Sequence, residues 1–310
     1  MGMESDPRGK ARVAKYLSKA KKAYEELKED EKQYFDLEKI ENPYSDSRIH
    51  AGLDTAKVKR ILVGIDIGSA ELLLASQLNE RNKNIDLAIA HHPIGKSLAD
   101  LHDVMDMAVD FYEDFGVPTH VAEDIMDERA REVGRSVHAA NHYATIDMAR
   151  ILGINLLNLH TVTDNLVQKF LTDFFKKKKP ETIGEAIKCL LEIPEYQEGK
   201  KRGFGPKIFA GAPNRRLGKY VIEMTGGTNP SNKVYQELSA AGVSTVIGMH
   251  MRDDATDKAK ERHMNVLIAG HISSDSLGMN LFLDELEKKG IEIVPCGGLI
   301  RVNRNNKKKN

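Results

Sequence analysis

Short runs of apolar and β-branched residues alternate along this chain with longer amphipathic stretches that have helical spacing. One unit is predicted as a strand at 60–65, a helix at about 70–82 and a second strand at 85–90, and a similar unit covers about 220–269. Strands that alternate with helices of this length predict a largely parallel sheet with helices on both faces. The alternation therefore constrains the main body of the chain to the α/β class.

Four of the apolar runs end on a histidine. These histidines are His91 (followed directly by His92), His160, His250 and His271. In an open α/β sheet the loops at the carboxyl ends of strands converge on the ligand crevice, so histidines from several strands can meet there. Asp164 and Asp275 each follow one of these histidines by four residues and would supply oxygen ligands for a divalent metal. The pattern predicts a metal site.

The adjacent pair His91 and His92 favours two ions, because the chain bends at Pro93 and both side chains can then turn toward one site. Two divalent ions about 3.5–4 Å apart usually share a bridging carboxylate, for which Asp164 is the best candidate. His160 and His250 are candidate catalytic residues that would relay protons or orient bound water.

A structural role is the alternative for each of these residues. A lone histidine at a strand end is more often a hydrogen-bonded structural residue than a ligand, and Asp275 or Ser274 could simply cap the following helix. Capping explains the aspartate but leaves His271 unexplained. The convergence of several histidines therefore favours the metal site.

Composition narrows the choice of partners. Basic and acidic residues balance at 46 each among 310 residues, which argues against nucleic acid or a membrane as the main partner. The lysine runs at 176–179 and 307–309 are interpreted as solvated ends. The first 30 residues contain no apolar targeting segment, and no later stretch is long and apolar enough for a membrane span, so a cytoplasmic protein is expected. The two cysteines lie far apart and are expected to be reduced.

The chain divides into five expected parts. These are an N-terminal helical extension (1–41), a first α/β lobe (42–165), a helical bridge (166–205), a second α/β lobe (206–302) and a basic disordered tail (303–310). In each lobe a strand, a helix and a second strand lead to a histidine. If the lobes are related, the histidines would meet between them, near a pseudo-twofold axis.

Three motifs resemble the Nif-three-like family, whose members are often described as type 2 homologues of GTP cyclohydrolase I. The motifs are DLAIAHHP at 86–93, HTVTDN at 160–165 and GHISSDSLGMN at 270–280. The resemblance covers about 42–302. It implies two related α/β lobes around a cleft that holds a dinuclear metal centre, and a ring-shaped homohexamer built as a trimer of dimers.

Carried over by motif, the resemblance implies five metal ligands, namely His91, His92, Asp164, His271 and Asp275. Family members commonly have Glu at the last of these positions, which makes Asp275 the least secure ligand. Imidazole together with carboxylate suits two divalent ions of Fe, Zn or Mn about equally well.

The leading functional hypothesis is a metal-dependent hydrolase-like enzyme in which two ions polarise a substrate oxygen and generate hydroxide, with a cyclohydrolase acting on a purine nucleotide as one special case. The alternative is a non-catalytic module that regulates, delivers metal or binds other proteins. Nucleic-acid binding inside a ring is the weakest of the three, because the net charge is zero.

Overall fold

The computed structural model describes residues 1–52 and 55–305. Its strands form two sheets. The first has the order β1-β4-β3-β2-β9, and the second has the order β5-β8-β7-β6. The strands of the first sheet are β1 (Arg48–Ala51), β2 (Arg60–Gly64), β3 (Leu87–Ala90), β4 (Asn155–Asn158) and β9 (Glu292–Cys296). Those of the second are β5 (Lys207–Ala210), β6 (Tyr220–Glu223), β7 (Thr245–Gly248) and β8 (Asn265–Ile268).

Apart from β9, the two sheets repeat one design. In each, the first strand in sequence is an antiparallel edge strand and the other three are parallel. Both edge strands carry a register irregularity at the same place, after Ile49 in β1 and after Ile208 in β5. The expectation of two related α/β lobes is confirmed at the level of sheet topology.

The repeat extends to one glycine in each lobe. Gly52 and Gly211 follow the edge strands with φ of +106° and +99°. A Cβ atom at Gly52 would lie 2.0 Å from the Asn155 side chain, and one at Gly211 would lie 2.5 Å from the Asn265 side chain. These asparagines open β4 and β8, so the same turn, with its left-handed glycine, recurs in both halves.

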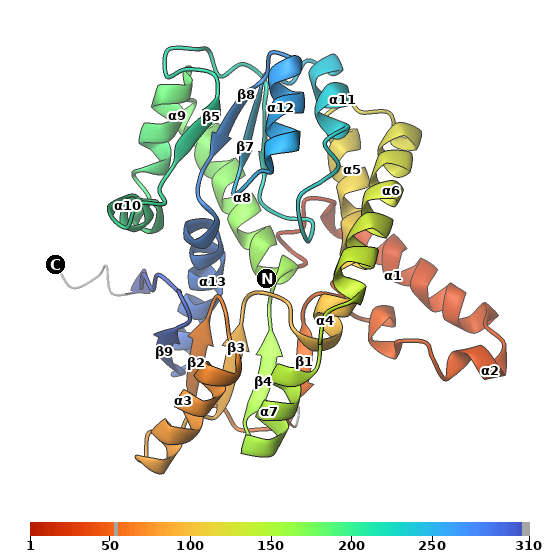
Figure 1. The fold of residues 1–310 in the computed structure, drawn as a ribbon, viewed down its shortest axis with the longest axis vertical. Coiled ribbons are helices and arrows are strands. Elements are labelled where there is room, and N and C mark those ends of the chain that lie inside the picture. The colour runs from red at the N-terminus through yellow and green to blue at the C-terminus, as the bar shows by residue number, and fades with distance from the viewer. Residues whose placement is uncertain (53–54, 306–310) are drawn as a thin grey trace.

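Helices and sheets alternate in layers (Figure 1). The outer face of the first sheet is covered by α3 (Ser69–Glu80) and α7 (Ala144–Leu152). Between the sheets lie α8 (Thr161–Lys178) and α13 (His271–Lys288). The outer face of the second sheet packs against α5 (Met107–Asp114), α6 (Thr119–His138), α11 (Val234–Ala240) and α12 (Asp253–Glu261). The remaining helices are α1 (Gly9–Glu26), α2 (Glu29–Lys32), α4 (Gly95–Ala99), α9 (Ile183–Leu190) and α10 (Pro194–Lys201), with 3-10 turns at Leu37–Ile40 and Leu101–Asp106.

The two central helices exchange lobes. Helix α8 follows β4 of the first sheet, yet its Val167, Leu171 and Phe175 belong to the core of the second sheet. Helix α13 follows β8 of the second sheet, yet its Met279 and Leu283 pack on the first sheet. Because each helix starts at one sheet and packs on the other, the first turns of both helices lie between the two sheets.

The element boundaries differ from the sequence prediction in a few places. Strand β9 was not predicted, because Pro295 argues against a strand; it occupies a sheet edge, where a missing N–H is tolerated. The range 206–302 therefore contributes one strand to the first sheet. Helix α6 begins at Thr119, directly after Pro118.

The ends of the chain are partly described. Within the N-terminal helical extension expected at 1–41, helix α1 runs from Gly9 to Glu26. Of the tail expected to be disordered (303–310), residues 303–305 form hydrogen bonds with Asp284 and Glu287 of α13, whereas residues 306–310 lie outside the described residues. Within residues 1–52 and 55–305, no helix is long and apolar enough to cross a lipid bilayer.

Candidate metal centre

The first turns of α8 and α13 meet the end of β3 between the sheets. His91 and His92 directly follow β3, His160 precedes the first residue of α8, and His271 is the first residue of α13. The two carboxylates lie one turn into these helices. Asp164 is in α8, and Asp275 is in α13. The structure thus brings together all five residues that the motifs assign to metal, and adds His160.

Nitrogen and oxygen atoms of these side chains face one another at short range. His91 Nε2 lies 3.6 Å from an Asp164 oxygen and 3.6 Å from an Asp275 oxygen. Two donors bound to one ion at about 2.1 Å lie roughly 3.0–3.4 Å apart. The observed separations are close to this value and longer than a normal hydrogen bond. Two groups, His91-His92-Asp275 and His91-His160-Asp164, are arranged so that each could hold an ion.

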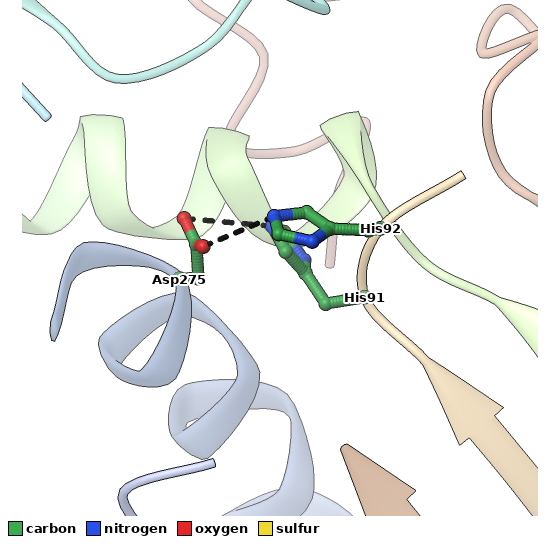
Figure 2. Close-up of side chains that lie close together, drawn as sticks. All are labelled: His91, His92 and Asp275. Atoms are coloured by element: carbon green, nitrogen blue, oxygen red, sulfur yellow. Dashed lines mark ion pairs between the residues drawn. The ribbon is translucent and has the colours of Figure 1, made fainter. Parts of the chain in front are cut away.

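The Asp275 carboxylate faces His91 and His92 (Figure 2). Its Oδ1 faces His91, whereas its Oδ2 lies 3.5 Å from His92 Nε2 and 3.4 Å from His271 Nε2. Asp164 instead faces His91 with one oxygen and His160, at 3.8 Å, with the other. The bridging position expected for Asp164 is therefore better matched by Asp275, whose two oxygens face different groups of histidines.

Three of the histidines are oriented by an acceptor behind the ring. His91 Nδ1 lies 3.0 Å from the Leu159 carbonyl oxygen, His92 Nδ1 lies 2.7 Å from Asp66, and His160 Nδ1 lies 2.8 Å from Asp46. A carbonyl or carboxylate oxygen only accepts, so each Nδ1 must donate. In the neutral ring the Nε2 atom then presents its lone pair to the cluster, which is the usual arrangement of a metal-bound histidine.

Several atoms at the centre of the cluster have no hydrogen-bond partner among the described residues. They are His91 Nε2, His92 Nε2, Asp164 Oδ1 and both carboxylate oxygens of Asp275. Burying polar atoms without partners is costly unless a ligand satisfies them. The unpartnered atoms are those that face one another, so the residues present fit one or two divalent cations.

The charges of the cluster agree with this fit. Burial raises the pKa of Asp164 to about 6, against the pull of the neighbouring histidines. Burial opposes ionisation of Asp275 too, but His91 and His92 hold the pKa of this carboxyl well below its usual range. Burial lowers the pKa of His160, yet Asp164 and Asp46 outweigh it and raise this pKa to about 9. The raised pKa values mean that His160 and Asp164 hold protons more tightly when no metal is bound. A metal would displace these protons on binding.

His250 lies beside the cluster, in neither candidate ligand group. Its ring is 4.5 Å from that of His271, centroid to centroid, and its Nδ1 lies 2.8 Å from the Asn229 side-chain oxygen. Burial, together with the nearby His271, lowers the pKa of His250 to about 4. His250 lines a pocket with His160, Asp164 and His271, so the cluster is reached from this pocket.

Sequence reasoning missed the residues behind the histidines. Asp46 is fully buried and accepts hydrogen bonds from His160 Nδ1 and the Thr161 hydroxyl, at 2.8 and 2.6 Å. Asp66 follows β2 at the same sheet edge as His92, so its place after a predicted strand was a usable signal. Asp46 lies in a turn before β1, and nothing near it in the sequence indicates its partner.

Similarity to known proteins is found among solved structures. No protein-family model and no curated protein matches the chain. Among solved structures, a NIF3 superfamily protein from Sphaerobacter thermophilus is 27% identical, covers 94% of this chain and 98% of its own, and superposes with a TM-score of 0.73. Reduced HcgD from Methanocaldococcus jannaschii covers 80% of this chain and 87% of its own, at 15% identity and a TM-score of 0.48. A Bacillus cereus protein related to NIF3 covers 81% and 91%, at 12% identity and a TM-score of 0.41.

The chain has two related α/β lobes, and a cluster of histidines and aspartates lies between the two helices that the lobes exchange. These features place it among candidate metal-binding α/β proteins. The likeness to the Sphaerobacter thermophilus protein extends over nearly the whole of both chains, and the three motifs lie at the cluster. The chain thus resembles a NIF3 superfamily protein over nearly its whole length, as the three motifs indicate.

Proposed function

We propose that this protein is a dinuclear metal-dependent enzyme of the hydrolase type. One observation carries the proposal: the unpartnered His91 Nε2, His92 Nε2 and Asp275 oxygens face one another at 3.5–3.6 Å, and the neighbouring His160, Asp164 and His271 line a pocket. A purely structural cluster would satisfy these atoms internally. An open pocket on one side is what a reacting centre needs.

The donors form two groups that share His91. His160 and Asp164 complete one group, and His92 and Asp275 complete the other, where His271 also faces Asp275. Imidazole and carboxylate donors suit Fe, Zn or Mn. When bound, such ions act as Lewis acids on a substrate oxygen and lower the pKa of water.

The chain itself supplies orientation and proton transfer. His250 carries no proton on one ring nitrogen at neutral pH, because its pKa is lowered to about 4, and its Nδ1 is held by Asn229. His250 is therefore a weak proton acceptor at the pocket wall, and we assign it the role of orienting bound water and receiving its proton. His160 was also a catalytic candidate, but its contacts with Asp164 and Asp46 favour a ligand.

The testing experiment is metal content per chain by elemental analysis, after purification without chelators and after reloading with Fe, Zn or Mn. The parent is compared with His91→Ala, His271→Ala and the control His120→Ala, which changes an exposed histidine of α6. We expect about two ions per chain in the parent and control and a sharp loss in the other two, each shown to be folded by circular dichroism. A folded parent that binds no added metal would overturn the proposal.

Activity is then measured against occupancy. Hydrolysis of p-nitrophenyl phosphate, p-nitrophenyl acetate and GTP is followed at increasing metal content, with GTP testing the cyclohydrolase case. A rate that rises with occupancy and falls in His250→Ala supports an enzyme. If no substrate is turned over and the metal passes readily to a chelator, the non-catalytic alternative of metal delivery or regulation replaces it.

The proposal includes a cytoplasmic protein that assembles as a homohexameric ring, a trimer of dimers. Light scattering coupled to size-exclusion chromatography tests the assembly. A mass six times that of the 34.6 kDa chain is expected, and a monomer would contradict it.

A further inference from the structure

The pocket beside the metal cluster has a second chemical feature away from the histidines. One part of its wall consists of His160, Asp164, His250 and His271. Another part includes the carboxylate of Glu223, the last residue of β6. Apolar side chains of α5 and α6, among them Phe111 and Met126, line the pocket as well. A ligand in this pocket would therefore meet a metal end, a carboxylate and an apolar surface.

Glu223 is held in place by two phenols. The hydroxyl of Tyr112 donates to Oε1 at 3.2 Å, and the hydroxyl of Tyr235 donates to Oε2 at 3.1 Å. Tyr112 belongs to α5 and Tyr235 to α11, and both rings are buried. Each oxygen thus uses one acceptor position, and each keeps another. The carboxylate is fixed in orientation while both of its oxygens can still accept.

Glu223 also lacks a charge partner. Among residues 1–52 and 55–305 no Lys, Arg or His forms an ion pair with Glu223, whereas Asp164 on the same pocket wall faces His91 and His160. Removing a carboxylate from water without a cation is costly. This cost is expected for a carboxylate whose counter-charge comes from a ligand. Burial raises the pKa of Glu223 and so disfavours its ionised form when no cation is near.

We propose that Glu223 is the recognition group for a ligand that carries an amidinium or guanidinium group on a small, flat apolar body. Two N–H groups in a planar fork match the two free acceptor positions of a fixed carboxylate. Phe111 and Met126 supply the surface for the apolar body. The inference rests on the proposed function only in taking the metal cluster as the reacting end of the pocket.

Benzamidine is the probe, because it joins an amidinium to a flat ring. Its affinity is measured by isothermal titration calorimetry at pH 8, for the full chain both loaded with metal and treated with chelator. Benzamide, the neutral analogue, is measured alongside. The variants are Glu223→Gln, Tyr235→Phe, which keeps the carboxylate, and Glu80→Gln on the exposed surface of α3 as the matched control.

We expect saturable benzamidine binding with and without metal, at least tenfold weaker binding in Glu223→Gln, an intermediate loss in Tyr235→Phe, which frees one carboxylate oxygen, and a change of less than about threefold in Glu80→Gln. Benzamide should bind at least tenfold more weakly than benzamidine. Absence of benzamidine binding to the parent, or equal binding to the parent and Glu223→Gln, would each overturn the inference. Because binding is measured without metal too, failure of the hydrolase proposal would leave this result unchanged.

Discussion

Gly278 of α13 lies so close to Thr163 of α8 that an added Cβ atom would be 2.4 Å from the Thr163 carbonyl oxygen. The contact lies beside the cluster, since Thr163 precedes Asp164 and Gly278 follows Asp275 by one turn. The absence of a side chain at Gly278 therefore allows the two exchanged helices to approach until their carboxylates share the histidines.

Gly278→Ala should separate α8 and α13 by a few tenths of an ångström or more, because backbone atoms cannot yield as a side chain can. We expect a loss of about 1–3 kcal/mol in the free energy of unfolding and at least tenfold weaker metal binding. Urea unfolding and chelator competition measure the two effects. Gly134→Ala in α6 is the control, since its Cβ would lie 3.3 Å from the His102 ring. Unchanged metal affinity in Gly278→Ala would show that the close approach does not shape the cluster.

The two aspartates behind the histidines should differ in their effect on metal binding. Asp46, which holds His160, has a side chain that is 0% exposed, whereas that of Asp66, which holds His92, is 73% exposed. Solvent screens the exposed pair but not the buried one. Asp46→Asn should weaken metal binding about tenfold or more, and Asp66→Asn only about twofold, as measured by chelator competition. Equal effects would contradict the argument from burial.

The histidines and their helices could be predicted from the sequence because the signals are local. Each histidine follows an apolar run, and Asp164 and Asp275 follow His160 and His271 by one helical turn. The α/β class and most of the parallel strands follow from the same alternation.

The role of Asp46 could not be predicted, because it depends on a contact distant in sequence. Asp46 reaches His160 only because β1 pairs antiparallel with β4, which leads to that histidine. Strand β1 is only four residues long (RIHA), and its apolar Ile49 is exposed while Arg48 is buried, so its sequence pattern does not indicate how it packs. The lobe exchange of α8 and α13 escapes prediction for a similar reason, since apolar spacing shows that a helix is buried but not against which sheet.

The Glu223 carboxyl should make stability depend on pH. Burial raises the pKa of Glu223 to about 7, from 4.5, so the folded chain binds this proton more tightly than the unfolded chain does. The stabilising contribution is fully present below pH 4.5 and is lost as the pH rises through 7. Glu223→Gln should therefore gain roughly 1–3 kcal/mol relative to the parent between pH 5 and pH 8.

Urea unfolding of both proteins at the two pH values tests this, because the other titrating groups cancel in the difference. Glu80→Gln provides the baseline for losing an exposed carboxylate. A parent-to-variant difference that is the same at pH 5 and pH 8 would show that Glu223 titrates normally.

The N-terminal segment should be an integral part of the fold around the cluster. Arg8 forms two side-chain hydrogen bonds with Asp6, at 3.1 and 2.8 Å, and the two side chains are 2% and 0% exposed. Tyr44 donates to the same carboxylate at 2.8 Å and accepts from Asn165, the neighbour of Asp164. The buried ion pair is thus connected through Tyr44 to the helix that carries a candidate ligand.

Arg8→Met removes the cation and leaves the Asp6 carboxylate buried, which should cost about 3 kcal/mol in the free energy of unfolding. The double variant Asp6→Asn with Arg8→Met removes the stranded charge and should recover part of this loss, because most of the cost of breaking a buried pair comes from the partner left behind. Urea unfolding of the parent, both single variants and the double variant completes the cycle. If the double variant is no more stable than Arg8→Met, the Asp6 charge is not the source of the loss, and the guanidinium contributes mainly by packing.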